Sequence, residues 1–219
     1  MERRWLVMKT TTDKPFGEDH ASFLRRFKLK VTPTDLKRLD MAYDVAKYGH
    51  RNQFRESGER YFEHVRGTAI ILVDELGVYD VELVMSALLH DMLEDSFLLK
   101  GDRTEMIFGA RVAYITATVS KPAKDDPRFS TAKQRLLFYH QQIKNGNWEV
   151  KLVKLADRLH NLRALMSCSL DKQRRKLAET KKTYLPLIRD LSGEYPEAAE
   201  KLETAFRRAI TQLQEVASQ

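Results

Sequence analysis

A stretch of apolar residues spaced three and four apart, in the second half of the chain, constrains the fold most. Between residues 148 and 166, one stripe consists of Leu152, Leu155, Leu159, Leu162 and Met166. This spacing indicates an amphipathic α-helix, whereas a strand needs a period of two. Asp157 and Asn161 lie one turn apart on a second row, beside Val150, Val153 and Ala164. A carboxylate and an amide therefore stand where packing residues are expected.

The rest of the chain repeats this helical period. We expect helices at 32–50, 61–76, 81–95, 104–118, 133–144, 148–166, 171–191 and 196–217, with loops at 51–60 and 122–131. Thr32 and Asp80 are predicted N-caps, Gly77 a C-cap, and Pro186 a kink. Only nine Gly and six Pro occur in 219 residues, and strand-like alternation is scarce, so the composition favours an all-α fold. We expect one domain at 32–219, preceded by an N-terminal extension at 1–31 that is irregular or partly helical.

Charge and cysteine content narrow the classes of function. The net charge of +7 suits nucleic acid, a polyanionic small substrate or simple solvation. Zinc-finger spacing and interleaved aromatic and basic residues do not occur, which makes nucleic acid an unlikely partner. The single Cys168 excludes an internal disulfide and fits a reducing cytoplasm, the predicted location. We see no signal peptide and no apolar run of the roughly 20 residues that a membrane span needs. A homo-oligomer is compatible with the sequence.

Three groups of polar residues interrupt segments that otherwise read as buried helix. They are Tyr61–His64, residues 90–95 and Asp157–Asn161. Imidazoles and carboxylates in apolar helices are costly unless something compensates them, and a divalent cation does so. The predicted ligands are His64, His90, Asp91 and Asp157. Such nitrogen and oxygen donors suit Mn²⁺, Fe²⁺, Co²⁺ or Mg²⁺ better than structural zinc. Glu94, one turn beyond His90, is placed to orient or deprotonate a water molecule, and Asp95 to support the site.

Five segments carry a resemblance to a known family. Residues 50–64 resemble the H-x-x-Q-x-R-x-S-G-x-x-Y-x-x-H signature of the RelA/SpoT-type alarmone hydrolases. Residues 87–95 resemble their A-x-L-H-D-x-x-E-D motif, and residues 108–121 are similar to F-G-x-x-V followed by V-T-K. Residues 153–163 match the last signature almost letter for letter, and residues 184–187 resemble Y-A-P-L. The similarity extends over about residues 36–191, in order and with the expected spacing.

The resemblance implies the HD superfamily, an all-α fold, and one Mn²⁺ held by His64, His90, Asp91 and Asp157. It implies hydrolysis of the 3′-diphosphate of guanosine 3′,5′-bis(diphosphate) or its pentaphosphate relative. Glu94 and Asp95 would take part in hydrolysis. Residues implied to contact the nucleotide or support it are Arg55, Ser57, Lys121, Arg158 and Asn161. Because no synthetase domain follows residue 219, the chain is expected to be a stand-alone small alarmone hydrolase.

The chain departs from the family pattern at three positions. Glu56 stands where Lys is common, Val65 where Pro is frequent, and Ala164 where Thr is frequent. None is a metal position, so hydrolysis is still expected, but Glu56 and Ala164 leave the base preference open between guanosine and adenosine alarmones. Three further alternatives are an HD phosphohydrolase for another nucleotide, a non-catalytic module that binds an alarmone or a protein, and nucleic-acid binding through the +7 charge.

Overall fold

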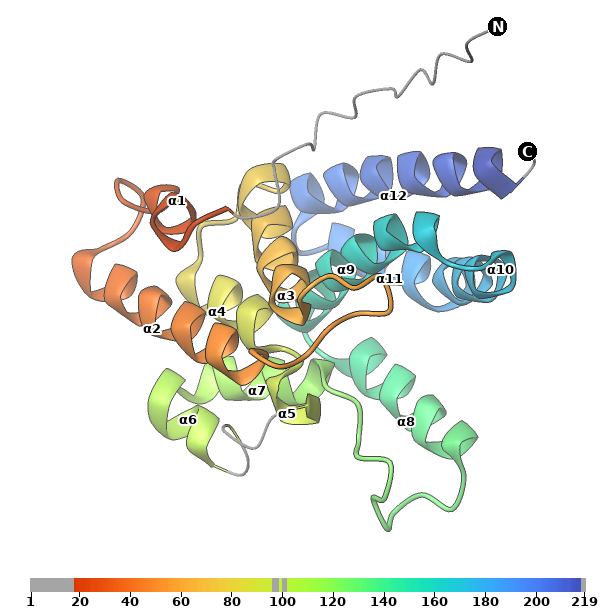
Figure 1. The fold of residues 1–219 in the computed structure, drawn as a ribbon, viewed down its shortest axis with the longest axis horizontal. Helices are drawn as coiled ribbons and strands as arrows, with labels where there is room; N and C mark the ends of the chain where they lie inside the picture. Colours follow the sequence, from red (N-terminus) through yellow and green to blue (C-terminus); the bar gives the residue numbers. More distant parts are fainter. Residues whose placement is uncertain (1–17, 96–98, 100–101, 218–219) are drawn as a thin grey trace, which may run out of the picture.

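Helices make up nearly all of the regular structure (Figure 1). The computed structural model describes residues 18–95, 99 and 102–217, and for residues 94, 95, 216 and 217 it describes the backbone alone. Within these residues, extended segments pair only at an isolated bridge between Phe54 and Arg60, inside the loop expected at 51–60. The predicted all-α fold is confirmed.

The helices follow one another with short connections. In chain order they are α1 (His20–Arg25), α2 (Pro33–Gly49), α3 (Tyr61–Ile70), α4 (Val81–Leu89), α5 (Met92–Asp95), α6 (Arg103–Phe108), α7 (Ala110–Val119), α8 (Ala132–Asn145), α9 (Trp148–Arg163), α10 (Leu170–Glu179), α11 (Leu185–Ser192) and α12 (Pro196–Ala217). Two π-helical segments, Ile71–Glu75 and Thr180–Tyr184, continue α3 and join α10 to α11, and a 3₁₀ turn, Ala164–Ser167, follows α9.

The predicted caps are where the helices begin and end. The Thr32 side chain accepts from the backbone N–H of Asp35 at 3.1 Å, with Pro33 as the first residue of α2. Asp80 caps α4 by accepting from two backbone N–H groups, at 3.0 and 3.2 Å. Gly77, with φ of +75°, ends the π-helical continuation of α3 in a conformation that favours glycine.

The single helix predicted at 104–118 is wrong, because Gly109 divides it into α6 and α7. Gly109 has φ of +95°, which no helix contains and which side chains rarely adopt. Arg38 donates to the carbonyl of Phe108 at 3.2 Å, so a side chain of α2 satisfies the carbonyl just before the break. That contact comes from 70 residues away along the chain and has no local sequence signal.

The continuous helix predicted at 81–95 is also wrong, because it turns at His90 and Asp91 between α4 and α5. In an uninterrupted helix the carbonyl of Ala87 would serve the N–H of residue 91. Here His90 Nδ1 lies 2.8 Å from that carbonyl, and Ser120 Oγ donates to the carbonyl of His90 at 2.9 Å. The turn places His90 and Asp91 at the end of an otherwise apolar helix.

The helix predicted at 171–191 is continuous but contains the π-helical segment 180–184. Pro186 follows at the start of α11 and lacks the N–H that a regular α-helix would need. The π turn lies where the proline interrupts the regular hydrogen bonding, and the predicted kink at Pro186 stays a prediction.

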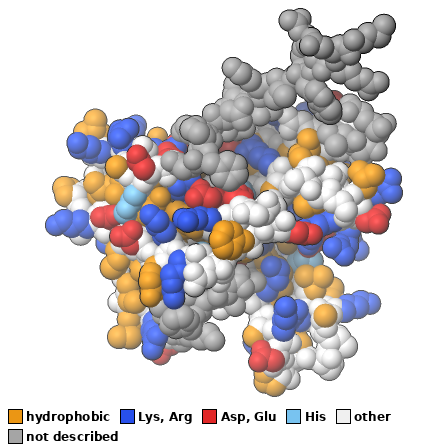
Figure 2. All heavy atoms as spheres, viewed as in Figure 1, with side chains coloured by type: hydrophobic (Ala, Val, Ile, Leu, Met, Phe, Trp, Pro, Cys, Tyr) orange, Lys and Arg blue, Asp and Glu red, His pale blue; other side chains and the backbone are white. Residues whose placement is uncertain are grey.

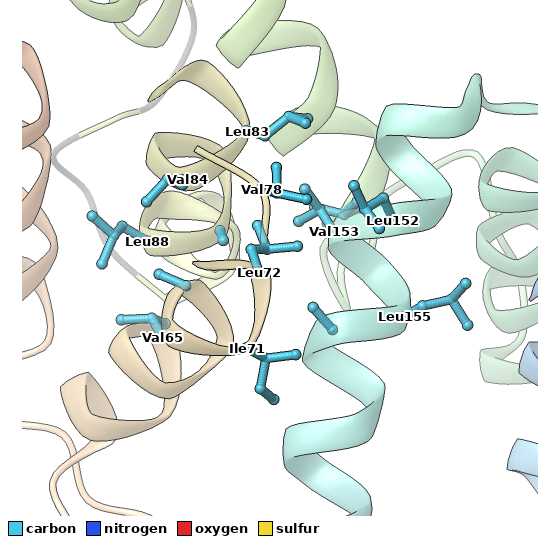
Figure 3. Close-up of a cluster of buried hydrophobic side chains, with 14 of the residues drawn as sticks. Val65, Ile71, Leu72, Val78, Leu83, Val84, Leu88, Leu152, Val153 and Leu155 are labelled. Atoms are coloured by element: carbon cyan, nitrogen blue, oxygen red, sulfur yellow. The ribbon is translucent and has the colours of Figure 1, made fainter. Parts of the chain in front are cut away.

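Helix α9 is the centre of the fold, in contact with α3, α4, α7, α8, α11 and α12 (Figure 1). Its buried Val153 points toward Leu72 and Val78, whereas Leu155 points to the opposite side of the helix (Figure 3). Full burial of each such side chain stabilises the fold by about 1.5–3 kcal/mol. The core therefore fixes the helix that also carries the buried charged residues Lys154, Asp157 and Arg158.

The described part of the predicted N-terminal extension packs against this core. Phe23 of α1 and Phe27 just after it are fully buried, and His20 stacks on Tyr43 of α2 with ring centroids 4.0 Å apart. The boundary at residue 31 stays a prediction. Residues 1–17 of the extension lie outside the described residues.

Lys and Arg side chains are scattered among acidic and apolar ones on the face drawn in Figure 2. Within the described residues, no helix combines the length and the apolar character that crossing a membrane would require.

Candidate metal centre and phosphate pocket

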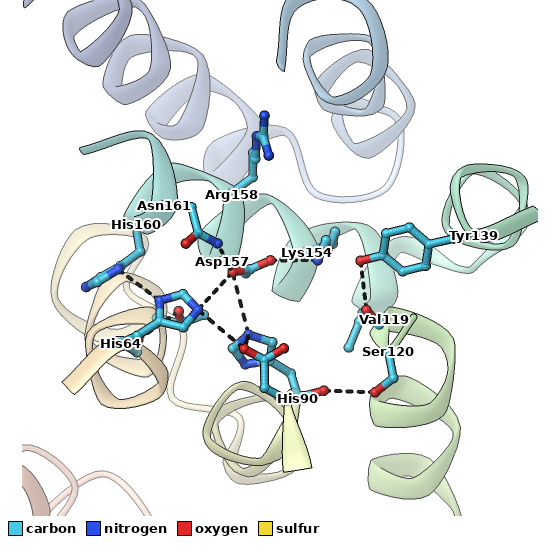
Figure 4. Close-up of polar contacts among 12 residues, drawn as sticks. His64, His90, Val119, Ser120, Tyr139, Lys154, Asp157, Arg158, His160 and Asn161 are labelled. Atoms are coloured by element: carbon cyan, nitrogen blue, oxygen red, sulfur yellow. Dashed lines mark hydrogen bonds and ion pairs between the residues drawn. The ribbon is translucent and has the colours of Figure 1, made fainter. Parts of the chain in front are cut away.

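Four buried side chains from three parts of the fold meet at one point, and Figure 4 shows three of them, His64, His90 and Asp157. His64 lies on α3, His90 and Asp91 at the turn after α4, and Asp157 in the middle of α9. Their exposed fractions are 2%, 0%, 8% and 4%. The structure thus brings together the four side chains that the sequence predicts as metal ligands.

The distances among these side chains suit a shared cation. Asp157 Oδ1 lies 3.1 Å from His64 Nε2 and 3.5 Å from His90 Nε2. Asp91 Oδ2 lies 3.6 Å from His64 Nε2 and 3.3 Å from His90 Nε2. Ligand atoms of His64, His90 and Asp157 all lie within 4.8 Å of one another. Two imidazole nitrogens therefore face two carboxylates at close range.

His90 provides the test of whether a cation fits. Its Nδ1 lies 2.8 Å from the carbonyl of Ala87, which can only accept, so Nδ1 carries the proton of the neutral ring. Its buried Nε2 makes no hydrogen bond and points at the carboxylates. Burial opposes a charge on this ring, but Asp91 and Asp157 outweigh it and raise the pKa of His90 to about 10. The site attracts positive charge, as a divalent-cation site with nitrogen and oxygen donors must.

A buried lysine lies beside the site on the same helix. Lys154 is 5% exposed, and its Nζ lies 2.7 Å from Asp157 Oδ2, the second oxygen of that carboxylate. Burial alone would lower the pKa of Lys154, but the Asp157 carboxylate raises it well above its ordinary value. Burial likewise works to raise the pKa of Asp157, yet Lys154 and the two imidazoles hold it well below its usual range. Both groups are therefore charged near neutral pH.

A pocket of about 260 Å³ opens beside these residues. His64, Asp91 and Asp157 form part of its wall. The wall also contains six cationic side chains, which are Arg55, Lys121, Lys154, Arg158, Lys172 and Lys176. Positive charge thus surrounds the acidic ligand set, an arrangement that attracts a polyanion to the metal site.

The predicted substrate-binding residues differ in their surroundings. Arg55 and Asn161 line the pocket and bond to each other, with Arg55 Nη2 donating to Asn161 Oδ1 at 2.6 Å. Asn161 Nδ2 in turn donates to Asp157 Oδ1 at 2.5 Å. Lys121 is an exposed residue of the same wall. Ser57 is exposed in the loop and is not among the pocket-lining residues, so its role stays a prediction.

Arg158 lines the pocket, but its guanidinium is engaged by the helices behind it. It donates to Thr180 Oγ1 at 2.8 Å and to the carbonyl of Lys176 at 2.6 Å, and it lies over the ring of Tyr184. Its contacts join α9 to the π-helical segment 180–184. The predicted catalytic residues Glu94 and Asp95 lie in α5, and their side chains are outside the described residues.

Three residues beside the site were not predicted as functional. Lys154 touches Asp157, the Tyr61 hydroxyl donates to Asp91 Oδ2 at 2.7 Å, and His160 Nδ1 lies 3.0 Å from His64 Nδ1. Lys154 had a usable signal, since a residue three positions before Asp157 shares its helix face. The contacts of Tyr61 and His160 depend on how α3, α4 and α9 pack, which no local pattern reveals.

A family model described as an HD domain matches residues 42–193 of this chain, a range that contains all four predicted ligands. The chain belongs to the HD-domain family. The match confirms the fold class, and the family implies a divalent metal of the kind that the His and Asp side chains fit.

Relatives of this HD domain confirm the resemblance to alarmone hydrolases. The bifunctional (p)ppGpp synthase/hydrolase SpoT of Escherichia coli K12 is 38% identical over 162 residues, which are 71% of this chain and 22% of that protein. The GTP pyrophosphokinase of Streptomyces coelicolor is 35% identical over 187 residues, which are 84% of this chain and 21% of the other. The chain spans about a fifth of the length of these relatives.

A solved structure extends the comparison to the fold. It is a metazoan orthologue of SpoT, which hydrolyses ppGpp and plays a role in starvation responses. The two structures agree with a TM-score of 0.63 at 26% identity, over 78% of this chain and 94% of that one. The HD domain described here thus has the same arrangement as nearly all of that protein's chain.

Proposed function

We propose that this HD domain hydrolyses the 3′-diphosphate of a (p)ppGpp-type alarmone, releasing GDP or GTP and pyrophosphate. The observation that carries the proposal is the convergence of two imidazoles and two carboxylates beside a pocket walled by six cations. The names of relatives support it, since the E. coli O157:H7 relative, 38% identical over 162 residues, is a guanosine-3′,5′-bis(diphosphate) 3′-pyrophosphohydrolase.

We propose Mn²⁺ as the metal, held by His64, His90, Asp91 and Asp157. A divalent cation at such a site acidifies water and neutralises charge that develops on a phosphate. The protein supplies the alignment of its ligands. Tyr61 holds Asp91 at 2.7 Å, while Lys154 and Asn161 hold the two oxygens of Asp157 at 2.7 and 2.5 Å. Each carboxylate is therefore oriented before a cation arrives.

Proton transfer is assigned to the acidic residues of α5. Glu94 takes the proton from the attacking water, and Asp95 supports it. We expect Glu94→Gln to retain the metal while turnover falls about 10²-fold or more, the scale of general acid–base assistance. Metal content and turnover are measured on the same preparation. Loss of metal together with activity would make Glu94 a ligand and this division of roles wrong.

The two diphosphates of the substrate are assigned to the cationic wall. Arg55 and Lys121 line the pocket and supply charges that match such a polyanion, while Lys172 and Lys176 of the same wall are paired with Glu56 and Glu179. Asn161 is assigned to the nucleotide sugar, Arg55 and Ser57 to the nucleotide, and Arg158 to support of the wall. The proposed location is the cytoplasm, in agreement with the single cysteine among 219 residues.

An adenosine alarmone is the second candidate substrate. Two departures from the family pattern favour this second candidate, because both affect residues at the pocket wall. Ala164, where Thr is frequent in the resembling family, lines the wall, and Glu56 pairs with the wall residue Lys172. A smaller side chain and a neutralised lysine change how a base is recognised.

A nucleotide panel tests the proposal. Pyrophosphate release is followed with guanosine and adenosine 3′,5′-bis(diphosphates) and a cyclic dinucleotide, each with Mn²⁺ and with EDTA. We expect release from a 3′-diphosphate nucleotide that EDTA abolishes. Release that is indifferent to EDTA contradicts the metal mechanism. Tight alarmone binding without release would show a binding module, and turnover of the cyclic dinucleotide alone would show a different HD phosphohydrolase.

A further inference from the structure

The two ring nitrogens of His64 face different partners (Figure 4). Nε2 points to the carboxylates of the metal site, 3.1 Å from Asp157 Oδ1. Nδ1 lies 3.0 Å from Nδ1 of His160, on the next turn of α9 after Asp157. A contact between two imidazole nitrogens does not by itself reveal which one donates, because either ring can exist as either tautomer.

Arg55 favours one assignment. Its Nη1 lies 3.5 Å from the same His160 Nδ1, at the outer limit of a hydrogen bond, and a guanidinium can only donate. Its Nη2 donates to Asn161 Oδ1 at 2.6 Å, which keeps the guanidinium directed at this part of α9. A donor on this side makes His160 Nδ1 the better acceptor, and a cation on His64 Nε2 needs the ring proton on Nδ1, so we assign the proton of the imidazole pair to His64 Nδ1.

The position of that proton determines what His64 offers to a metal. With Nδ1 protonated, the neutral ring has its lone pair on Nε2, the nitrogen that faces the carboxylates. His90 reaches the same state through the carbonyl of Ala87. The two imidazoles of the site are thus matched, one oriented by a backbone carbonyl and the other by a second imidazole.

Gly67 provides independent evidence that the position of the His160 ring matters. Gly67 is in the middle of α3, where glycine is a poor helix former. A Cβ at this position would lie 2.3 Å from His160 Nε2 and 2.4 Å from its Cδ2. The ring of His160 occupies the space that any other side chain at position 67 would need.

We infer that His160 is a positioning residue for the metal, acting through His64: it accepts the Nδ1 proton of His64 and so directs Nε2 to the cation. This inference rests on the metal site of the proposed function and adds a residue outside the ligand set. Partners of this kind are typically worth 10–100-fold in metal affinity.

Two pairs of variants test the inference with Mn²⁺ alone, titrated calorimetrically into the full chain without nucleotide. Asn and Leu have similar shapes, but only Asn offers an oxygen near the place of Nδ1. We expect His160→Leu to weaken Mn²⁺ binding about 10-fold or more and His160→Asn to stay within about 3-fold of wild type. Gly67→Ala, which displaces the ring and alters no polar group, should weaken binding as His160→Leu does. Gly77→Ala, a glycine substitution remote from the site, should leave the affinity unchanged.

Equal affinity in His160→Leu, His160→Asn and wild type overturns the inference, as does an unchanged affinity in Gly67→Ala. If His160→Leu fails to fold, judged by circular dichroism, Gly67→Ala decides between the outcomes. If the variants show the expected order of Mn²⁺ affinities but wild type releases no pyrophosphate from any alarmone, the inference is supported and the proposed function is contradicted. Failure of the inference and failure of the proposed function are therefore distinguishable.

Discussion

Removal of the buried Lys154 charge should destabilise the metal-free protein more than it destabilises the Mn²⁺-loaded protein. The perturbation is Lys154→Met, which keeps the length of the side chain and removes its charge. Lys154 and Asp157 are 5% and 4% exposed, and their charged atoms are 2.7 Å apart. Loss of one partner from a buried pair costs about 3–5 kcal/mol, because the other charge is left uncompensated.

Asp157 retains two imidazoles at 3.1 and 3.5 Å, so we expect the lower end, about 3 kcal/mol. For a chain of 150–250 residues, 1 kcal/mol corresponds to about 2–4 °C in Tm, which predicts a fall of about 6–12 °C without metal. With saturating Mn²⁺ the cation compensates Asp157, and the difference from wild type should shrink. Thermal unfolding with EDTA and with Mn²⁺ measures both values.

The matched control is Lys151→Met, one turn earlier on α9. Lys151 lies 3.7 Å from Asp190, and their side chains are 14% and 44% exposed. A more exposed and longer pair of this kind contributes about 0–1 kcal/mol. If Lys154→Met unfolds at the same temperature as Lys151→Met in EDTA, the reasoning about a buried charge pair is refuted.

Three further predictions follow from individual contacts. Asp157→Asn should lose Mn²⁺ and turnover while keeping its helical circular dichroism, and near-normal metal content would contradict the site. Glu56→Lys should lower KM for the guanosine alarmone with little change in kcat, because it releases Lys172 from its ion pair and adds a second cation. The fall in KM should shrink at high salt. A flat or raised KM would mean that position 56 does not face the nucleotide. Burial works to raise the pKa of Asp80, but hydrogen bonds from Arg111 hold that pKa below its usual range. The contribution of the Asp80 carboxylate to stability is therefore complete above about pH 4 and is lost as the pH falls through the pKa of the folded state. Asp80→Asn keeps an N-cap and should flatten the acid-side loss of unfolding free energy in urea melts; an unchanged slope would count against this carboxylate.

The fold was predictable where local chemistry decides it. The N-caps Thr32 and Asp80 mark helix starts through bonds to N–H groups two or three residues away, and the stripe of α9 follows from its spacing. The breaks at Gly109 and His90 were missed because distant side chains satisfy the freed carbonyls, Arg38 at one and Ser120 at the other. Propensity alone does not contain such tertiary bonds.

The cluster of four proposed metal ligands was predictable because polar residues in apolar helices need an explanation, and all four are indeed buried. Lys154 did not stand out in this way, because a lysine within a helix is usually solvated. Its burial becomes visible only when α8 and the π-helical segment before α11 cover it, with the ring of Tyr139 beneath its Nζ at 5.2 Å. His160 was missed because its partner is 96 residues away in the sequence.

One consequence of the central position of α9 concerns insertions and deletions. Lys154, Asp157, Arg158, His160 and Asn161 all project from this single helix. Asp157 and His160 contact His64 of α3, Arg158 bonds to Thr180 of the π-helical segment before α11, Asn161 bonds to Arg55 of the loop at 51–60, and Lys154 pairs with Asp157 itself. One residue added within 155–156 would rotate everything beyond it by about 100° and shift it by about 1.5 Å. This one insertion would break the contacts of Asp157 and His160 with His64 and of Asn161 with Arg55. We therefore expect insertions and deletions to be tolerated in the connections between helices and not within α9, where the spacing of these residues sets the geometry of the site.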